Sequence, residues 1–138
     1  MKYNILYVED DEVLIYLFKR SFKAYFNILT AVSAEEALNV LENEEIHLLI
    51  TDQYLPGFTG TELLKEIKGK YFPMSKVMIT GSDETDVLRE AFENGEICNY
   101  VQKPWNDDIF LFTMNKALET YQLKKDLAEA QKSLELKN

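Results

Sequence analysis

Four polar positions that lie far apart in the sequence each follow a short apolar run. They are Glu9 with Asp10, Asp52, Thr80 and Lys103. If the apolar runs are strands of one parallel sheet, their carboxyl ends line a single crevice, which is where ligands bind in such sheets. Carboxylates suit a divalent metal ion, and a hydroxyl with an ammonium group suits a phosphoryl group. The sequence therefore predicts a site for a metal ion and a phosphoryl group at this edge.

The apolar runs alternate with helical patterns along the whole chain. We expect strands at residues 4–8, 27–32, 47–51, 76–80 and 99–102. We expect helices at residues 11–24, after Ser33, after the loop 56–60, after residues 82–83, and from Pro104 almost to Asn138. Five strand–helix units with short connections predict right-handed crossovers and a doubly wound α/β fold with three α/β/α layers. The candidate site then lies at the carboxyl edge of one parallel sheet.

Composition and charge limit what the chain can do. Its 138 residues suffice for one domain, and 46% hydrophobic with 28% charged residues is typical of a globular protein. The net charge of −9 argues against direct nucleic-acid binding, because phosphate backbones need a basic surface. The single cysteine, Cys98, fits a reducing compartment, and the sequence contains neither a signal peptide nor a membrane-spanning run. We therefore expect a cytoplasmic protein without membrane insertion.

Four motifs carry a resemblance to a known family. They are residues 7–11 (YVEDD), 51–57 (TDQYLPG), 79–81 (ITG) and 101–104 (VQKP). In order, spacing and position at strand ends they resemble the receiver domain of two-component response regulators, over residues 1 to about 120. The resemblance implies a flavodoxin-like fold with strand order 2-1-3-4-5 and a cis peptide bond between Lys103 and Pro104. It also implies that one aspartate accepts a phosphoryl group from a histidine kinase or a histidine phosphotransfer protein. Such a domain is a signalling switch that catalyses only its own phosphorylation and dephosphorylation.

The residues of the site can be given individual roles. Asp52 follows a buried strand and precedes a Pro-Gly loop, so we expect its carboxylate to be the phospho-acceptor. A carboxylate attacks phosphorus only if the charge between them is neutralised, which Mg²⁺ (or Mn²⁺) can do through oxygen ligands. We expect Asp10 and Asp52 to bind the metal directly, with Glu9 holding a metal-bound water. The backbone carbonyl of Tyr54 would supply a further ligand, and Lys103 would pair first with Asp52 and then with the phosphoryl group.

The resemblance also assigns residues that report phosphorylation and set its lifetime. Thr80 would bond the new phosphoryl group through its hydroxyl, and Tyr100 would then turn from an exposed to a buried rotamer. Tyr54 and Asp83 follow shortly after Asp52 and Thr80, at positions that flank the path of the hydrolytic water in receivers. We expect these two side chains to tune dephosphorylation.

Three other residues have structural interpretations. Asp11 is either the N-terminal cap of the first helix or a third metal ligand, and the cap is the favoured interpretation. His47 is the single histidine and stands where a strand begins, so we expect it to be structural. Cys98 is expected to be a small, half-buried apolar residue.

The end of the chain differs in character from the rest. Apolar residues recur at coiled-coil spacing in Leu123, Leu127, Ala130 and Leu134, and residues 122–138 carry four lysines against three acids. We expect a receiver domain at residues 1–121 and a helical linker at 122–138, which leads towards an output domain beyond the sequence. A tryptophan at position 105 is a feature of receivers that are fused to large signalling output domains, which is one interpretation that the resemblance allows. The alternative is that Trp105 only packs over the start of the last helix. We expect a homodimer. Its interface is either the linker helix or the surface formed by the helix after residues 82–83, the last strand and the last helix. The alternative for residues 122–138 is a frayed helix end that pairs with nothing.

Two other functions are compatible with parts of the pattern. A haloacid-dehalogenase-like phosphohydrolase also uses an aspartate nucleophile and Mg²⁺, but it would have a second acid where this chain has Tyr54. A degenerate receiver that acts as a phosphorylation-independent docking module would have lost the acidic pair, the nucleophile or the lysine. All of these are present here. The phospho-acceptor function is therefore favoured over both alternatives.

Overall fold

The computed structural model of the protein describes residues 2–81 and 85–137, within which five strands alternate with five helices. In chain order these are β1 (Asn4–Val8), α1 (Glu12–Phe22), β2 (Asn27–Ala31), α2 (Ala34–Asn43), β3 (Leu48–Asp52), α3 (Gly60–Glu66), β4 (Ser75–Thr80), α4 (Thr85–Glu93), β5 (Asn99–Gln102) and α5 (Asp107–Lys137). All strand pairs are parallel, and the strand order is β2-β1-β3-β4-β5. The predicted doubly wound, flavodoxin-like fold is confirmed.

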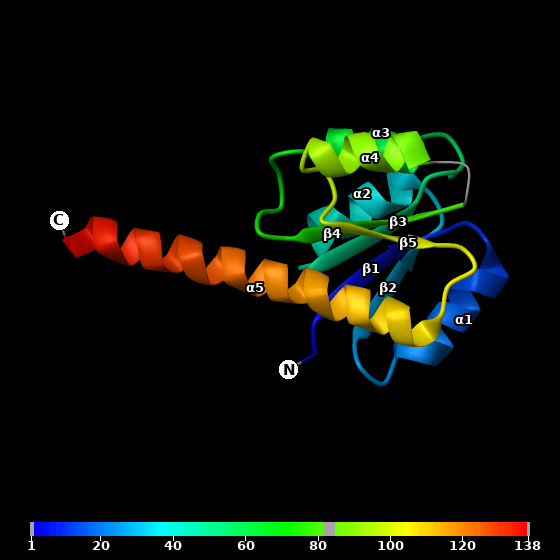
Figure 1. Cartoon of the computed structure of the whole chain (residues 1–138), viewed down its shortest axis with the longest axis horizontal. Coiled ribbons are helices and arrows are strands. Elements are labelled where there is room, and N and C mark those ends of the chain that lie inside the picture. The colour runs from blue at the N-terminus through cyan, green and yellow to red at the C-terminus, as the bar shows by residue number, and fades with distance from the viewer. Residues whose placement is uncertain (1, 82–84, 138) are drawn as a thin grey trace.

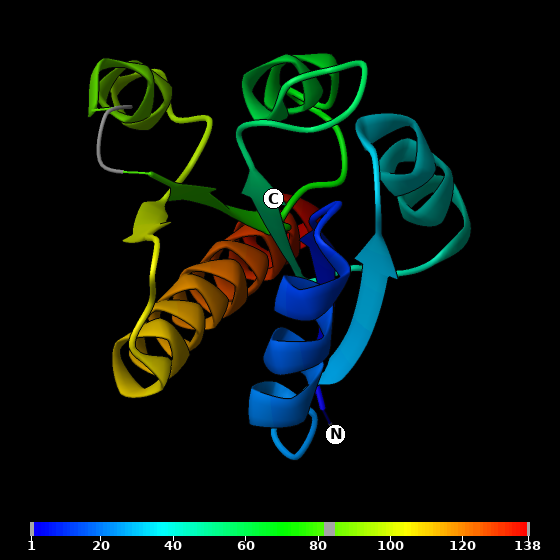
Figure 2. The ribbon, with the colours of Figure 1, turned by 90° about the vertical axis from the view of Figure 1, so that its right-hand side faces the viewer.

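The sheet lies between two layers of helices. Helices α2, α3 and α4 cover one face, and α1 and α5 cover the other (Figure 2). Each layer encloses its own hydrophobic core, so all five residues of the central strand β3 are buried. A fully buried Leu, Ile or Phe contributes about 1.5–3 kcal/mol relative to an exposed one. The strands that carry the candidate site are therefore fixed from both sides.

A cluster of aromatic rings holds α1 and α5 against β1. Tyr7 of β1 stacks on Phe18 of α1 with ring centroids 4.1 Å apart, and Phe18 meets Phe110 of α5 edge-on at 5.4 Å. Trp105 packs edge-on against both Tyr7 and Phe110. Each such pair adds about 0.5–1.5 kcal/mol beyond the burial of its area. Trp105 thus has the packing role over the start of the last helix that was one of its two interpretations.

The first helix begins directly after the acidic run. The side chain of Asp11 accepts hydrogen bonds from the backbone N–H groups of Val13 and Leu14, at 2.9 and 3.3 Å. This is the geometry of an N-cap, which satisfies donors that the helix leaves unpaired. The cap interpretation of Asp11 is confirmed, and its side chain faces the helix.

One element boundary differs from the sequence prediction in a way that matters for the site. Strand β3 extends one residue further, because Asp52 still pairs with Ile79 of β4. Helix α5 continues to Lys137, as the sequence predicted, and its C-terminal part extends beyond the body of the domain (Figure 1). Across the described residues, no helix is both long and apolar enough to cross a membrane.

Candidate functional site

Three carboxylates meet at the carboxyl edge of the sheet. Glu9 and Asp10 directly follow β1, and Asp52 ends the neighbouring strand β3. One oxygen atom from each lies within 4.8 Å of the others, with Glu9 and Asp52 buried and Asp10 exposed. Carboxylate oxygens in such a cluster are the ligands that Mg²⁺ prefers, and the exposed Asp10 leaves a side open to waters and a ligand. The residues present therefore fit a divalent metal ion.

Lys103 connects two of these carboxylates. Its Nζ donates to Asp52 Oδ2 at 2.9 Å and to Glu9 Oε1 at 3.1 Å. The residue follows β5, and the peptide bond to Pro104 is cis, as the sequence resemblance implied. Its backbone N–H donates to the carbonyl of Thr80 at 2.8 Å, which ties the end of β5 to the end of β4. The pairing of Lys103 with Asp52 was expected from the sequence, whereas the second pairing with Glu9 was not.

Glu9 is enclosed by donors from the protein itself. Its side chain is 1% exposed. Oε1 accepts from Lys103 and, at 3.5 Å, from the hydroxyl of Tyr7, while Oε2 accepts from the backbone N–H groups of Asp10 and Asp11. Burial raises the pKa of Glu9, the hydrogen bond from Lys103 opposes this effect, and the negative charge of Asp52 adds to it.

The partners of Glu9 have shifted pKa values as well. Burial alone would lower the pKa of Lys103, but its hydrogen bonds to Asp52 and Glu9 outweigh burial and raise it. Burial and, after it, the charge of Glu9 raise the pKa of Tyr7 far above its ordinary value. Lys103 is therefore cationic and Tyr7 a neutral donor throughout the physiological pH range. The contact of the Tyr7 hydroxyl with Glu9 was not part of the sequence prediction.

Asp52 is held by two donors at the bottom of the site. Its side chain is 9% exposed, Oδ1 accepts from the backbone N–H of Gln53 at 2.8 Å, and Oδ2 accepts from Lys103. The N-terminus of α3 lies directly against this residue. Gly60 donates its N–H to the carbonyl of Gln53 at 2.8 Å, and a Cβ on Gly60 would overlap the carbonyl oxygen of Asp52. Gly60 therefore allows the close approach that positions the end of β3.

The start of α3 is a feature that the sequence could have revealed. Thr59 and Glu62 form a reciprocal capping box, in which Thr59 Oγ1 accepts from the N–H of Glu62 and Glu62 Oε1 accepts from the N–H of Thr59. The spacing Thr-x-x-Glu is a known signature of this motif. It fixes the first residue of α3, and with it the position of Gly60.

Replacement of Gly60 by alanine tests this contact. In an ordinary helix Gly→Ala stabilises by about 0.5–1 kcal/mol. At position 60 we expect the opposite sign, a loss of about 1–3 kcal/mol, because the new methyl group must displace the backbone at Asp52. Urea denaturation measures the free energy of unfolding, and Glu66→Ala on the same helix is the control. A stabilised Gly60→Ala variant would contradict the assigned role.

The predicted switch residues lie on neighbouring strands. Thr80 ends β4, is fully buried, and donates its hydroxyl to the carbonyl of Gly81 at 3.0 Å. Tyr100 on β5 is 48% exposed and, with Leu88, Arg89 and Phe92, lines a cavity of about 320 Å³ beside α4. Its inward turn on phosphorylation remains a prediction.

The structure describes one of the two residues that are expected to tune dephosphorylation. Tyr54 lies two residues after β3 with an exposed side chain, and the metal role of its carbonyl remains a prediction. Asp83 lies outside the described residues.

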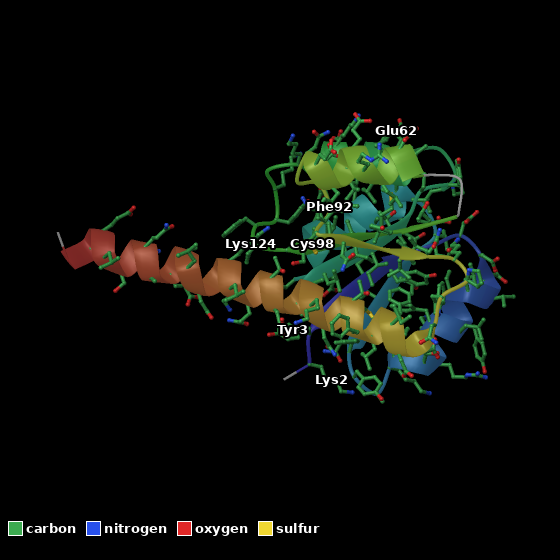
Figure 3. All side chains as sticks on the ribbon, in the orientation of Figure 1. Lys2, Tyr3, Glu62, Phe92, Cys98 and Lys124 are labelled. Carbon is green, nitrogen blue, oxygen red and sulfur yellow. The ribbon has the colours of Figure 1, made fainter. Side chains whose placement is uncertain are left out.

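His47 and Cys98 occupy structural positions, as expected. Nδ1 of the buried His47 accepts from the N–H of Asn4 at 2.8 Å, and Nε2 lies 2.8 Å from Glu45 Oε1. The imidazole therefore ties the start of β3 to that of β1. Cys98 is half-buried ahead of β5, on the side from which Lys124 approaches (Figure 3), and burial raises the pKa of its thiol. Neither residue belongs to the carboxylate site.

Comparisons with known proteins place the chain in a family. A family model of the response regulator receiver domain matches residues 5–131. The hydrogenase transcriptional regulatory protein HoxA of Cupriavidus necator is 32% identical over 125 residues, which cover 90% of this chain and 26% of that protein. The chain thus spans about a quarter of the length of this curated relative.

Solved structures show the same likeness. The signal receiver domain of an HD domain-containing protein from Pseudomonas fluorescens is 28% identical with a TM-score of 0.82, covering 88% of this chain and 98% of that one. An adenylate cyclase from Rhodopirellula baltica is 25% identical with a TM-score of 0.90, covering 96% of this chain and 98% of that one. The match of the family model over most of the sequence, the strand order and the carboxylate–lysine site lead to one conclusion: this chain belongs to the response regulator receiver domain family.

Proposed function

We propose that this receiver domain is the phospho-acceptor switch of a two-component system, in which Asp52 takes a phosphoryl group from a histidine kinase or a histidine phosphotransfer protein. One observation carries the proposal: Lys103 bridges Asp52 and Glu9 beside the exposed Asp10. A nucleophile, a cation and oxygen ligands for a metal ion thus share one edge of the sheet. A degenerate docking module would have no need to keep this combination. Two-component signalling and the lone half-buried cysteine also favour the cytoplasm as its location.

Each residue of the site would have its own role in phosphoryl transfer. Asp10, Asp52 and Glu9 would hold Mg²⁺, which neutralises charge between the attacking carboxylate and the phosphoryl oxygens. A bond forms between a carboxylate oxygen of Asp52 and phosphorus while the bond from phosphorus to the donor nitrogen breaks. Lys103, already at hydrogen-bonding distance from Asp52, transfers one hydrogen bond to a phosphoryl oxygen.

The signal would leave the site through Thr80 and Tyr100. Thr80 sits at the end of β4, next to the strand that carries Asp52, and its hydroxyl would exchange the carbonyl of Gly81 for a phosphoryl oxygen. Tyr100 would then turn inward and change the surface formed with Leu88 and Phe92. Tyr54 and Asp83 would set the lifetime of the phosphorylated state.

The direct test is phosphoryl transfer from a small donor. We expect the protein to gain one phosphoryl group from acetyl phosphate in the presence of Mg²⁺ and none in its absence, as measured by intact-protein mass spectrometry. An unchanged protein mass under both conditions would refute the phospho-acceptor function and leave the docking module as the alternative.

We also propose that residues 122–138 form a linker helix that pairs with a second copy of the chain. The apolar side chains of its seam are exposed, namely Leu123, Leu127 and Leu134. They recur with the spacing of a coiled coil, in which each would fill a hole on the partner helix. The receiver domain proper would then end near residue 121, and the paired helices would lead into an output domain.

A charge in the seam tests this pairing. We expect the wild-type chain to be a dimer by light scattering and Leu127→Glu to be a monomer, because a carboxylate cannot be buried between the helices without cost. Lys132→Glu introduces a charge change in the same helix, off the seam, and should remain a dimer. If Phe92→Glu dissociates the dimer and Leu127→Glu does not, the interface is the face of α4, β5 and α5 instead.

A further inference from the structure

A cavity lies between α3 and α4, apart from the carboxylate site. Its volume is about 250 Å³, and both helices lie on the same face of the sheet (Figure 2). The loop before α3, helix α3, helix α4 and the turn before β5 all contribute to its wall. The lining residues are Gln53, Thr59, Thr61, Glu62, Lys65, Val87, Glu90, Ala91 and Glu96. Three glutamates face one lysine, so the cavity is negatively charged.

Glu96 is the unusual member of this wall. The residue is only 4% exposed, and its Oε2 is buried without any hydrogen-bond donor among the described residues. Leaving a buried polar group unpaired costs about 1–3 kcal/mol, and more if it is charged. Native structures rarely accept this cost without a ligand, an ion or a function.

No neighbouring group in the described part of the chain supplies the hydrogen bond that Glu96 Oε2 lacks. Lys76 on β4 is near enough for Glu96 to affect its pKa, which burial lowers, yet the two side chains form no ion pair within 4.0 Å. Gln53 accepts at Oε1 from the N–H and hydroxyl of Thr61, at 2.9 and 2.7 Å, and its amide N–H₂ does not donate to the buried Oε2 of Glu96. Glu62, on the outer side of α3 (Figure 3), accepts in the capping box with Thr59 and, as a carboxylate, has no donor to offer.

The geometry of the cavity limits its occupant. Within the described residues, the acids at Glu9, Asp10 and Asp52 are the ones grouped closely enough for a metal ion, so a bare divalent cation does not fit here. The volume lies below the range of about 300–1,000 Å³ for drug-sized ligands, which favours a group the size of one side chain. Val87 and Ala91 offer an apolar wall for methylene groups, and the carboxylates offer acceptors for a cationic head.

We propose that the cavity between α3 and α4 binds an alkyl-guanidinium group, whose charged head pairs with the buried carboxylate of Glu96 and whose methylenes lie against Val87 and Ala91. Guanidinium is preferred over ammonium because its planar fork binds carboxylates through two hydrogen bonds and is more weakly hydrated. The acidic character of the chain would favour the approach of such a group. The site is separate from the phospho-acceptor chemistry, although Gln53 borders both.

Titration with n-butylguanidinium, followed through backbone amide shifts by NMR, tests the proposal. We expect saturable shifts at residues of the cavity wall, including Gln53 and Ala91, and none with the neutral isostere n-butylurea. Glu96→Gln should weaken binding roughly tenfold or more, the range of a charge-assisted hydrogen bond. Glu93→Gln carries the same charge change at an exposed position of α4 outside the cavity and should bind as wild type. Equal binding of n-butylurea, or equal affinities of the two variants, would overturn the proposal.

The source of the group is decided with a second probe. If the group is a protein side chain, the tripeptide acetyl-Gly-Arg-Gly-amide binds at least as tightly as n-butylguanidinium. If it is a small molecule, the peptide is excluded while n-butylguanidinium and free agmatine bind. Either result supports the guanidinium chemistry.

Stability distinguishes a ligand site from a structural ion pair. Glu96→Met removes the unpaired carboxylate with little change of shape, so we expect the ligand-free variant to melt at the same temperature as wild type or higher. A lower melting temperature, relieved when Lys76→Met is combined with it, would mean that Glu96 is the counterion of Lys76 in solution and would overturn the proposal. Phosphoryl uptake at Asp52 should be unchanged in both Glu96 variants, so failure here leaves the proposed function standing.

Discussion

Asp52→Asn should take up phosphoryl groups from acetyl phosphate no faster than a protein-free control. The amide is close in shape to the carboxylate but lacks the anionic oxygen that attacks phosphorus. Lys103 keeps its pair with Glu9 in the variant, and the repulsion between Glu9 and residue 52 disappears. The variant should therefore fold, which near-wild-type circular dichroism and an unchanged or higher melting temperature would establish. Intact-protein mass spectrometry over a time course measures the uptake.

Asp11→Asn is the matched control for this experiment. It removes one negative charge from the same acidic edge, yet asparagine caps helices as well as aspartate does. Because the side chain of Asp11 accepts from Val13 and Leu14, we expect the variant to take up the phosphoryl group at close to the wild-type rate. Phosphoryl uptake by Asp52→Asn would contradict the assignment of the acceptor. Loss of uptake in Asp11→Asn would contradict the assignment of Asp11 as a helix cap that does not bind the metal ion.

The fold and the central part of the site could be predicted because they depend on local patterns. Each strand of the sheet is a short apolar run, and chain direction alone decides which residue follows its carboxyl end. Asp52 and Lys103 therefore lie at the same edge of the sheet, on strands separated by β4, and the long side chain of Lys103 can span that separation. The length of α5 could also be predicted from a local pattern, since helical periodicity continues without a break almost to the end of the chain.

Features that depend on packing between elements could not be predicted. The contact of the Tyr7 hydroxyl with Glu9 and the second pairing of Lys103 with Glu9 depend on how these long side chains pack, as when Tyr7 stacks on Phe18 of α1. The tight approach of Gly60 to Asp52 depends on where α3 docks, although the capping box was legible in the sequence. The burial of Glu96 was not part of the sequence prediction, because the cavity wall that it joins is assembled from α3, α4 and the turn before β5.

Lys103→Met should have the largest effect on stability. The substitution keeps an unbranched stem but removes the cation between two buried carboxylates, leaving Glu9 and Asp52 facing each other. Breaking a buried ion pair from one side costs about 3–5 kcal/mol. Lys103 is itself 27% exposed at its side chain, so we expect the lower end of that range at pH 7 without divalent cations. Urea denaturation measures the loss, and Lys116→Met, which breaks an exposed pair with Glu119, should change stability by less than about 1 kcal/mol.

The pH dependence identifies the cause of this loss. The folded-state pKa of Glu9 is raised above its ordinary value of 4.5, so the folded protein binds a proton that the unfolded chain has released. Its contribution to stability is therefore full below pH 4.5 and is lost as pH rises towards the raised pKa. Removal of Lys103 takes away the group that opposes the shift, which extends the window to higher pH and deepens the loss. The difference between wild type and Lys103→Met should consequently shrink as pH falls towards 4.5.

Divalent cations provide the complementary test. Mg²⁺ bound by Asp10 and Asp52 would replace part of the charge that Lys103 supplies, so millimolar Mg²⁺ should stabilise Lys103→Met more than wild type. Asp10→Asn combined with Lys103→Met should remove that recovery, because it takes away the exposed carboxylate of the cluster. A loss of stability that is the same at every pH and indifferent to Mg²⁺ would mean that the lysine stem acts by packing alone. The carboxylate cluster would then be held together by the sheet, without a requirement for charge compensation.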